Sequence, residues 1–116
     1  MLKLQCITFD AQNPEKLSAF WHGMLGGNLG NEGEDQYWLE FENGEADILF
    51  LKVTDKKVVK NRLHFDLRPS NQEAEIEKAI LLGATHVDIG QKGDESWKVL
   101  ADVEGNEFCI LAARSS

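Results

Sequence analysis

The chain carries one pattern of predicted elements twice, and this repeat constrains its fold more than any other feature. Asn13 and Asn71 each stand at the expected start of a helix, and Leu25-Gly26 and Leu82-Gly83 stand at the expected ends. Equivalent positions are offset by about 57 to 61 residues, as an internal duplication would leave. Because each half is too small to bury its own sheet, we expect the halves to pack together.

The first half predicts one helix among several strands. Pro14 suits the first helical position, and the helix is expected to end at Gly26 or Gly27. The glycine-rich run 26–35 is expected to be a loop, and Asn43-Gly44 is expected to be a hairpin turn. The strands expected in this half cover 2–10, 37–42 and 46–53.

The second half predicts the same order of elements. Its helix is expected at 71–82, and Ser70 with Glu73 forms a capping-box pattern just before it. The strands expected in this half cover 63–68, a short run near 85–89, 97–102 and 107–112. The fold class is therefore α+β, with two tandem βαβββ modules.

Length and charge limit the kind of protein this chain can be. At 116 residues and 13.0 kDa we expect a single domain over 1–116, with module one at 1–55 and module two at 56–116. A net charge of −8 argues against nucleic acid and anionic membrane as partners. The N-terminal run MLKLQCITFD does not look like a signal peptide, and two cysteines without an export signal favour a cytoplasmic location.

His64 is the first candidate for chemistry. It lies in a predicted strand and shares a strand face with Asp66, while Glu107 is expected on a second strand. A histidine near carboxylates can move protons near neutral pH. His64, Asp66 and Glu107 are thus candidate acid/base residues, against the alternative that His64 only contacts a ligand or stabilises the fold.

Three motifs together resemble a known superfamily. They are LQCITFDAQNPEKLSAFWHGMLGG at the first helix, RLHFDLRP leading to LLGATHV, and LADVEGNEFCIL near the end. They resemble the vicinal oxygen chelate superfamily, which includes glyoxalase I, extradiol dioxygenases and bleomycin resistance proteins, and they are most similar to its glyoxalase-like proteins. The resemblance implies a curved mixed sheet around a cleft that holds a divalent metal.

The metal-ligand positions implied by the resemblance are mostly replaced. They fall on Cys6, Ile48, His64 and Cys109, of which only His64 matches the family's ligands. Hard or borderline metal ions need oxygen and nitrogen ligands, so we expect no metal cofactor and neither glyoxalase I activity nor ring cleavage. The alternative is a zinc site made by Cys6, His64 and Cys109, since two cysteines and a histidine form a known catalytic zinc set.

The resemblance also implies a binding cleft and leaves two functions open. The residues expected to line the cleft are Cys6, Thr8, Ile48, Phe50, His64, Asp66 and Cys109. One function is metal-free binding of a neutral or cationic small molecule, by analogy with bleomycin resistance proteins. The other is a lyase or isomerase acting on a small carbonyl compound, through His64 with a carboxylate or through the zinc set. Either protein is expected to be a homodimer.

Overall fold

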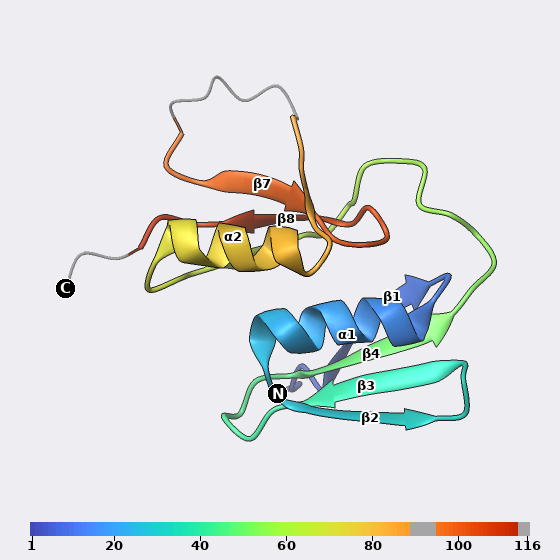
Figure 1. Ribbon diagram of the computed structural model, residues 1–116. Helices are drawn as coiled ribbons and strands as arrows, with labels where there is room; N and C mark the ends of the chain where they lie inside the picture. The colour runs from blue at the N-terminus through green and yellow to red at the C-terminus, as the bar shows by residue number, and fades with distance from the viewer. Residues whose placement is uncertain (89–94, 114–116) are drawn as a thin grey trace. The chain divides into compact units, whose positions relative to one another are not determined.

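The computed structural model describes residues 1–88 and 95–113. It divides the chain into two compact units, Met1–Lys56 and Lys57–Ser116, and each unit contains one helix and a four-stranded mixed sheet (Figure 1). The two units have the same topology, which confirms the predicted α+β class and its two βαβββ modules.

The first unit contains β1 (Cys6–Ala11), α1 (Pro14–Leu25), β2 (Asn28–Glu32), β3 (Gln36–Glu40) and β4 (Asp47–Lys52). Its sheet order is β1-β4-β3-β2, in which β1 and β4 are parallel and the other pairs antiparallel. The expected loop at 26–35 is therefore wrong, since β2 lies within it. Polar and glycine-rich residues can form this strand because β3 supplies an open edge for backbone pairing.

Helix α1 begins and packs as its sequence predicts. The Asn13 side chain accepts a hydrogen bond of 3.1 Å from the Lys16 backbone N–H, and Pro14 takes the first helical position. Trp21 is buried, and Phe9 stacks on it with ring centroids 6.1 Å apart. Phe9 also stacks on Phe50, with centroids 5.5 Å apart, so α1 is fixed to one face of the sheet through aromatic side chains.

The second unit contains β5 (Phe65–Leu67), α2 (Gln72–Leu81), β6 (Thr85–His86), β7 (Lys98–Ala101) and β8 (Glu107–Ile110). Its order, β5-β8-β7-β6, repeats that of the first unit. The short strand expected near 85–89 is observed as β6, and Ile89 lies outside the described residues.

The expected cap of the second helix is off by one residue. The Asn71 side chain accepts a hydrogen bond of 3.1 Å from the Ala74 backbone N–H, so Asn71 and not Ser70 is the N-cap. Asn71 also corresponds to Asn13 in the first unit, which means that the duplication predicts this cap better than the Ser-x-x-Glu pattern does.

The turn between β7 and β8 is organised by one buried carboxylate. Asp102 is 4% exposed, and its Oδ1 accepts backbone hydrogen bonds from Glu104 at 2.9 Å and Asn106 at 3.0 Å. The Asn106 side-chain amide donates to both carboxylate oxygens, and Gly105 takes a positive φ of 87°. This network fixes the start of β8 and thereby the register of Cys109.

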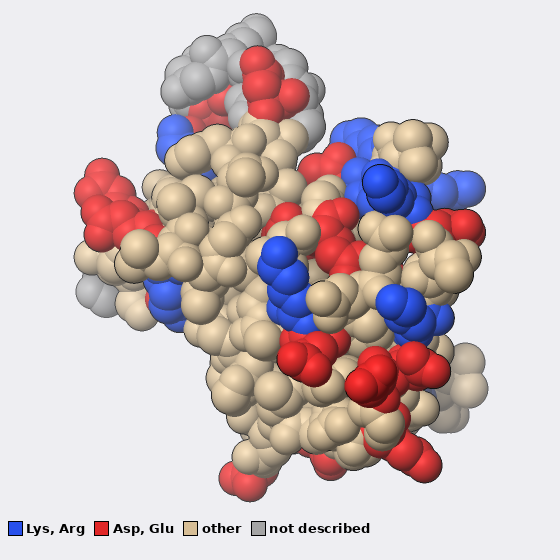
Figure 2. Space-filling model, turned by 45° about the vertical axis from the view of Figure 1, so that its right-hand side comes forward, with Lys and Arg blue, Asp and Glu red and all other residues tan. Residues whose placement is uncertain are grey.

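The surface carries charges of both signs. Acidic and basic side chains are interspersed on the face drawn in Figure 2. Within residues 1–88 and 95–113, no helix combines the length and the apolar character needed to cross a bilayer.

Candidate functional site

The two faces of the first sheet differ in what covers them. Cys6 and Thr8 are exposed and pair with Asp47 and Leu49, on the face opposite α1. Pairing with Leu49 places Trp38 on this side as well. We call this the open face of the first unit and define it by Cys6, Thr8, Trp38 and Leu49.

Ile48 and Phe50 do not lie on this open face. They pair with Ile7 and Phe9 and are buried on the face that packs on α1. The prediction that these two residues share a face with Cys6 and Thr8 is therefore corrected by the register, because successive side chains in a strand point to opposite faces. Leu49 takes the place that was assigned to Ile48.

Trp38 shapes the open face of the first unit. A Cβ built on Gly30, its cross-strand neighbour, would lie 2.4 Å from the Trp38 indole nitrogen. The indole therefore lies directly over the glycine, and only glycine leaves room for it. This arrangement gives the open face a flat aromatic surface beside Leu49.

In the second unit, four of the predicted site residues share one strand face. Asp66 pairs with Cys109 across β5 and β8, and alternation along the strands places His64 and Glu107 on the same side. We call this the open face of the second unit. It consists of the exposed His64 and Asp66, the largely buried Glu107 and the buried Cys109. Phe65 and Phe108 pair with each other and lie on the opposite face.

Three of these residues come together as a compact group. One ligand atom each of His64, Asp66 and Cys109 lies within 4.8 Å of the other two. The His64 Nε2 is 3.2 Å from the Asp66 Oδ1. Burial raises the pKa of the Cys109 thiol. The negative charge of Asp66 and the hydrogen bond that the thiol donates to Asp66 raise the pKa further, against a smaller opposing effect of Lys60. Asp66 therefore contacts both neighbours, and Cys109 is a neutral thiol at physiological pH.

Glu107, the third acid/base candidate, is engaged elsewhere. Its carboxylate lies 3.0 Å from the Lys57 ammonium, and both side chains are largely buried. Burial alone would raise the Glu107 pKa, but the hydrogen bond and charge of Lys57, together with backbone hydrogen bonds at Glu107 and Asn61, outweigh it and the net shift is downward. No sequence pattern indicated Lys57, which lies in a polar connecting segment.

Cys6 belongs to the first unit, where it is exposed and its Sγ lies 3.9 Å from the Thr8 Oγ1. Of the zinc set predicted from Cys6, His64 and Cys109, the structure brings His64 and Cys109 together in the second unit. Asp66, which the prediction assigned to acid/base chemistry, completes the group there.

The residues present do not reproduce the metal site implied by the superfamily. Parallel pairing makes Leu49 the counterpart of Cys109, because Leu49 pairs with Thr8 as Cys109 pairs with Asp66. Leucine offers no ligand atom, and cysteine sulfur is a poor ligand for magnesium or manganese. The group of His64, Asp66 and Cys109 offers one nitrogen, one oxygen and one sulfur, which suits zinc.

Comparison with known families agrees with this architecture. The model of the glyoxalase-like domain family matches residues 6–111. The chain belongs to the glyoxalase-like domain family. The match includes all ten helices and strands of the described residues, so the vicinal oxygen chelate resemblance of the sequence is confirmed.

Solved structures of other glyoxalase-like and related proteins have the same fold. A glyoxalase/bleomycin resistance protein/dioxygenase family enzyme from Burkholderia phytofirmans PsJN is 20% identical, with a TM-score of 0.73 over 97% of this chain and 100% of that one. The fosfomycin resistance protein FosX from Listeria monocytogenes, in complex with Mn(II) and a dihydroxypropylphosphonic acid, is 14% identical, with a TM-score of 0.71 over 97% and 90%. TnmS3, an antibiotic binding protein from Streptomyces sp. CB03234, is 10% identical, with a TM-score of 0.65 over 98% of each chain. A comparison with curated protein sequences gave no match.

Proposed function

We propose that this glyoxalase-like protein binds a neutral or cationic small molecule through the open faces of its sheets, without the oxygen- and nitrogen-ligated metal of the superfamily. The observation that carries this proposal is the replacement of the family's ligands. Cys6, Leu49 and Cys109 stand at the implied ligand positions, and only His64 matches. On the open face of the first unit, Trp38 and Leu49 supply an apolar surface. On the open face of the second unit, His64 and Asp66 supply polar contacts. Apolar and polar groups of these kinds are typical of small-molecule sites.

The preference for a neutral or cationic compound follows from charge. The protein carries a net charge of −8, and Asp66 is exposed at the open face of the second unit. An anionic ligand would meet an unfavourable potential there. TnmS3, which has the same fold, is an antibiotic binding protein, and this supports a binding role by analogy.

A ligand screen by thermal unfolding tests this proposal. A compound present at 100 times its dissociation constant adds about 2.7 kcal/mol of stability, which is readily measured. We expect stabilisation by aromatic cationic or neutral compounds, and a smaller shift in Asp66→Asn. The control is Glu77→Gln, which removes the same charge from an exposed position on α2. Stabilisation by divalent metals alone, with no organic compound active, would contradict metal-free binding.

The compact group in the second unit favours a second candidate, a lyase or isomerase of small carbonyl compounds. The 3.2 Å contact between His64 Nε2 and Asp66 Oδ1 lets the Nε2–H donate a hydrogen bond to the carboxylate, which leaves Nδ1 to take a proton from substrate. Asp66 would then stabilise the imidazolium, as a carboxylate does beside a catalytic histidine.

The same group carries the zinc version of this candidate. Ligand atoms on a tetrahedral zinc lie roughly 3.5 Å apart at ordinary bond lengths, so small side-chain rotations would bring His64, Asp66 and Cys109 to that geometry. Bound zinc would polarise a carbonyl oxygen as a Lewis acid.

Metal analysis of protein purified without a histidine tag decides between the versions. Stoichiometric zinc that is lost in both Cys109→Ser and Asp66→Asn would establish the group within the second unit. Loss in Cys6→Ser but not in Asp66→Asn would instead establish the set of Cys6, His64 and Cys109. Protein free of zinc after growth with added zinc would exclude the zinc version.

A further inference from the structure

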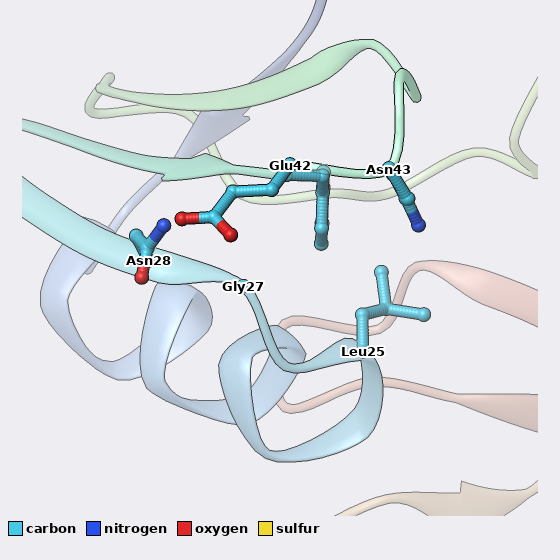
Figure 3. A pocket seen from close by; sticks show the side chains of 6 residues that line it. Leu25, Gly27, Asn28, Glu42 and Asn43 are labelled. Atoms are coloured by element: carbon cyan, nitrogen blue, oxygen red, sulfur yellow. The ribbon is translucent and has the colours of Figure 1, made fainter.

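A hollow of about 370 Å³ lies in the first unit, where α1 ends and the connection from β3 to β4 begins (Figure 3). It is open to solvent and lined by Leu25, Gly27, Asn28, Phe41, Glu42 and Asn43. None of these residues belongs to the open faces defined above. The volume is in the range of sites for small organic molecules and far exceeds that of a single ion.

Glu42 gives the hollow its charge. Its side chain extends across the hollow toward Asn28, and its carboxylate is exposed (Figure 3). No ion pair involving Glu42 is formed within residues 1–88 and 95–113. A carboxylate that is not neutralised by a neighbouring base favours a cationic guest.

The end of α1 adds to this preference. The helix has twelve residues and ends at Leu25, with Gly26 as its C-cap, so the hollow is lined by residues at and just beyond the helix C-terminus. The C-terminal end of a helix carries a partial negative charge, which favours cations. The helix end and the Glu42 carboxylate therefore act in the same direction.

Phe41 and Leu25 form the apolar part of the wall. A Cβ built on Gly27 would lie 2.8 Å from the Phe41 Cε1 and 3.0 Å from the Glu40 backbone oxygen, so the ring lies against the Gly27 backbone. Gly27 also has a positive φ of 84°, which a side chain would disfavour. The ring is thus held in place, and an aromatic face beside a carboxylate suits a cation that carries hydrocarbon.

We propose that this hollow binds a small primary ammonium compound with an apolar group. The ammonium group donates hydrogen bonds to the Glu42 carboxylate, and the apolar group packs on Phe41 and Leu25. The Asn43 Oδ1 already accepts a hydrogen bond of 3.0 Å from the Glu45 backbone N–H, so the Asn43 amide contributes its nitrogen, which suits a hydroxyl or carbonyl substituent on the ligand.

Phenethylamine is a suitable probe, because it is a cation at neutral pH and carries one aromatic ring. We expect it to shift the backbone amide NMR signals of Gly27, Asn28 and Glu42 in the full chain to saturation. 2-Phenylethanol, which lacks the charge, should bind about threefold to fivefold more weakly, as expected for loss of one exposed ion pair. Phenylacetate, which reverses the charge, should give no saturable shift. Equal binding of the three compounds would overturn the proposal.

Two variants and one control locate the binding. Glu42→Gln should weaken phenethylamine binding about threefold to fivefold, whereas Glu45→Gln, which removes an exposed charge from the same connection outside the hollow, should leave it unchanged. Phe41→Leu should also weaken binding, through loss of the aromatic face. Binding that is unchanged in Glu42→Gln, or that falls equally in Glu45→Gln, would refute the site. The backbone amide signals of His64 and Asp66 report separately on binding at the open face of the second unit.

Discussion

At the scale of single residues, the two cysteines occupy chemically different environments. Cys6 is exposed, whereas Cys109 is buried and its pKa is raised by burial and by Asp66. The thiolate is the reactive form, so we expect one thiol to react quickly with a disulfide reagent at pH 7.5 and the other slowly. Mass spectrometry should identify the fast residue as Cys6.

The Asp66 contribution to this difference can be measured. Asp66→Asn removes the negative charge and should lower the pKa of Cys109, so that its reaction begins at a lower pH and is several-fold faster at pH 8. Asp10→Asn, an exposed change on β1, is the control. If Cys109 reacts at the same rate in both variants and in the unmodified protein, Asp66 does not influence the thiol.

The ion pair of Lys57 and Glu107 should make stability depend on pH. The pKa of Glu107 is lowered in the folded protein, so the pair stabilises the fold above the unfolded-state pKa, and this stabilisation is lost as the pH falls through the folded-state pKa. Lys57→Met should cost about 1 kcal/mol at pH 7 and much less at pH 3. Urea unfolding at both pH values measures the free energy of unfolding that Lys57→Met removes. An equal loss at pH 7 and pH 3 would show that the ion pair does not make stability depend on pH.

At the scale of elements, the helix caps give a direct test of the repeat. Asn71→Ala removes the acceptor for the Ala74 backbone N–H and should destabilise the protein by about 1 kcal/mol. Asn13→Ala should have a similar effect on α1. Ser70→Ala is the matched control and should change the free energy of unfolding by less than about 0.5 kcal/mol. A larger effect of Ser70 than of Asn71 would restore the Ser-x-x-Glu capping box.

The β7–β8 turn and the β3–β4 connection are equivalent in the two units. Loss of a side-chain acceptor should destabilise the protein more in the β7–β8 turn. Asp102→Ala leaves two backbone N–H groups and the Asn106 amide without their acceptor in a buried site, and should cost about 2 kcal/mol in urea unfolding. Asn43→Ala removes a single exposed hydrogen bond from the corresponding connection and should cost under about 1 kcal/mol. Equal losses of unfolding free energy in the two variants would show that burial of Asp102 does not add to the stability of the turn.

The same two connections explain which parts of the site the sequence could predict. Spacing between the repeats predicted the order of elements and the shared face of His64 and Asp66, because alternation along one strand needs no turn geometry. The implied ligand position in the first unit falls on Ile48 because it is counted four residues from Gly44, just as the position in the second unit is counted four residues from Gly105 and falls on Cys109. However, the connection 41–46 is one residue longer than the connection 102–106, and a shift of one residue moves every side chain to the other face.

Contacts between distant segments could not be predicted in this way. The pairing of Lys57 with Glu107 depends on how a polar connecting segment returns to β8, which has no periodic signal. The strand β2 was missed because its sequence, NLGNE, has the composition of a loop and is held by pairing with β3.

At the scale of the whole molecule, exposed apolar side chains support the expected homodimer. Val58 and Val59 are 87% and 76% exposed, and Leu63 nearby is 69% exposed. Large apolar side chains close together in the sequence and open to water favour a protein partner, and we propose a second copy of this chain. Sedimentation at micromolar concentration should give twice the 13.0 kDa chain mass.

The double variant Val58→Ser with Val59→Ser should shift this equilibrium toward the monomer at least tenfold, since burial of two valines contributes several kcal/mol. Lys56→Ser, a polar change two residues away, should leave the mass unchanged. A 13.0 kDa species at every concentration would contradict the dimer, and a double variant that remains dimeric would place the interface elsewhere. Ligand binding measured on the monomeric variant would then show whether the open faces bind small molecules without a partner subunit.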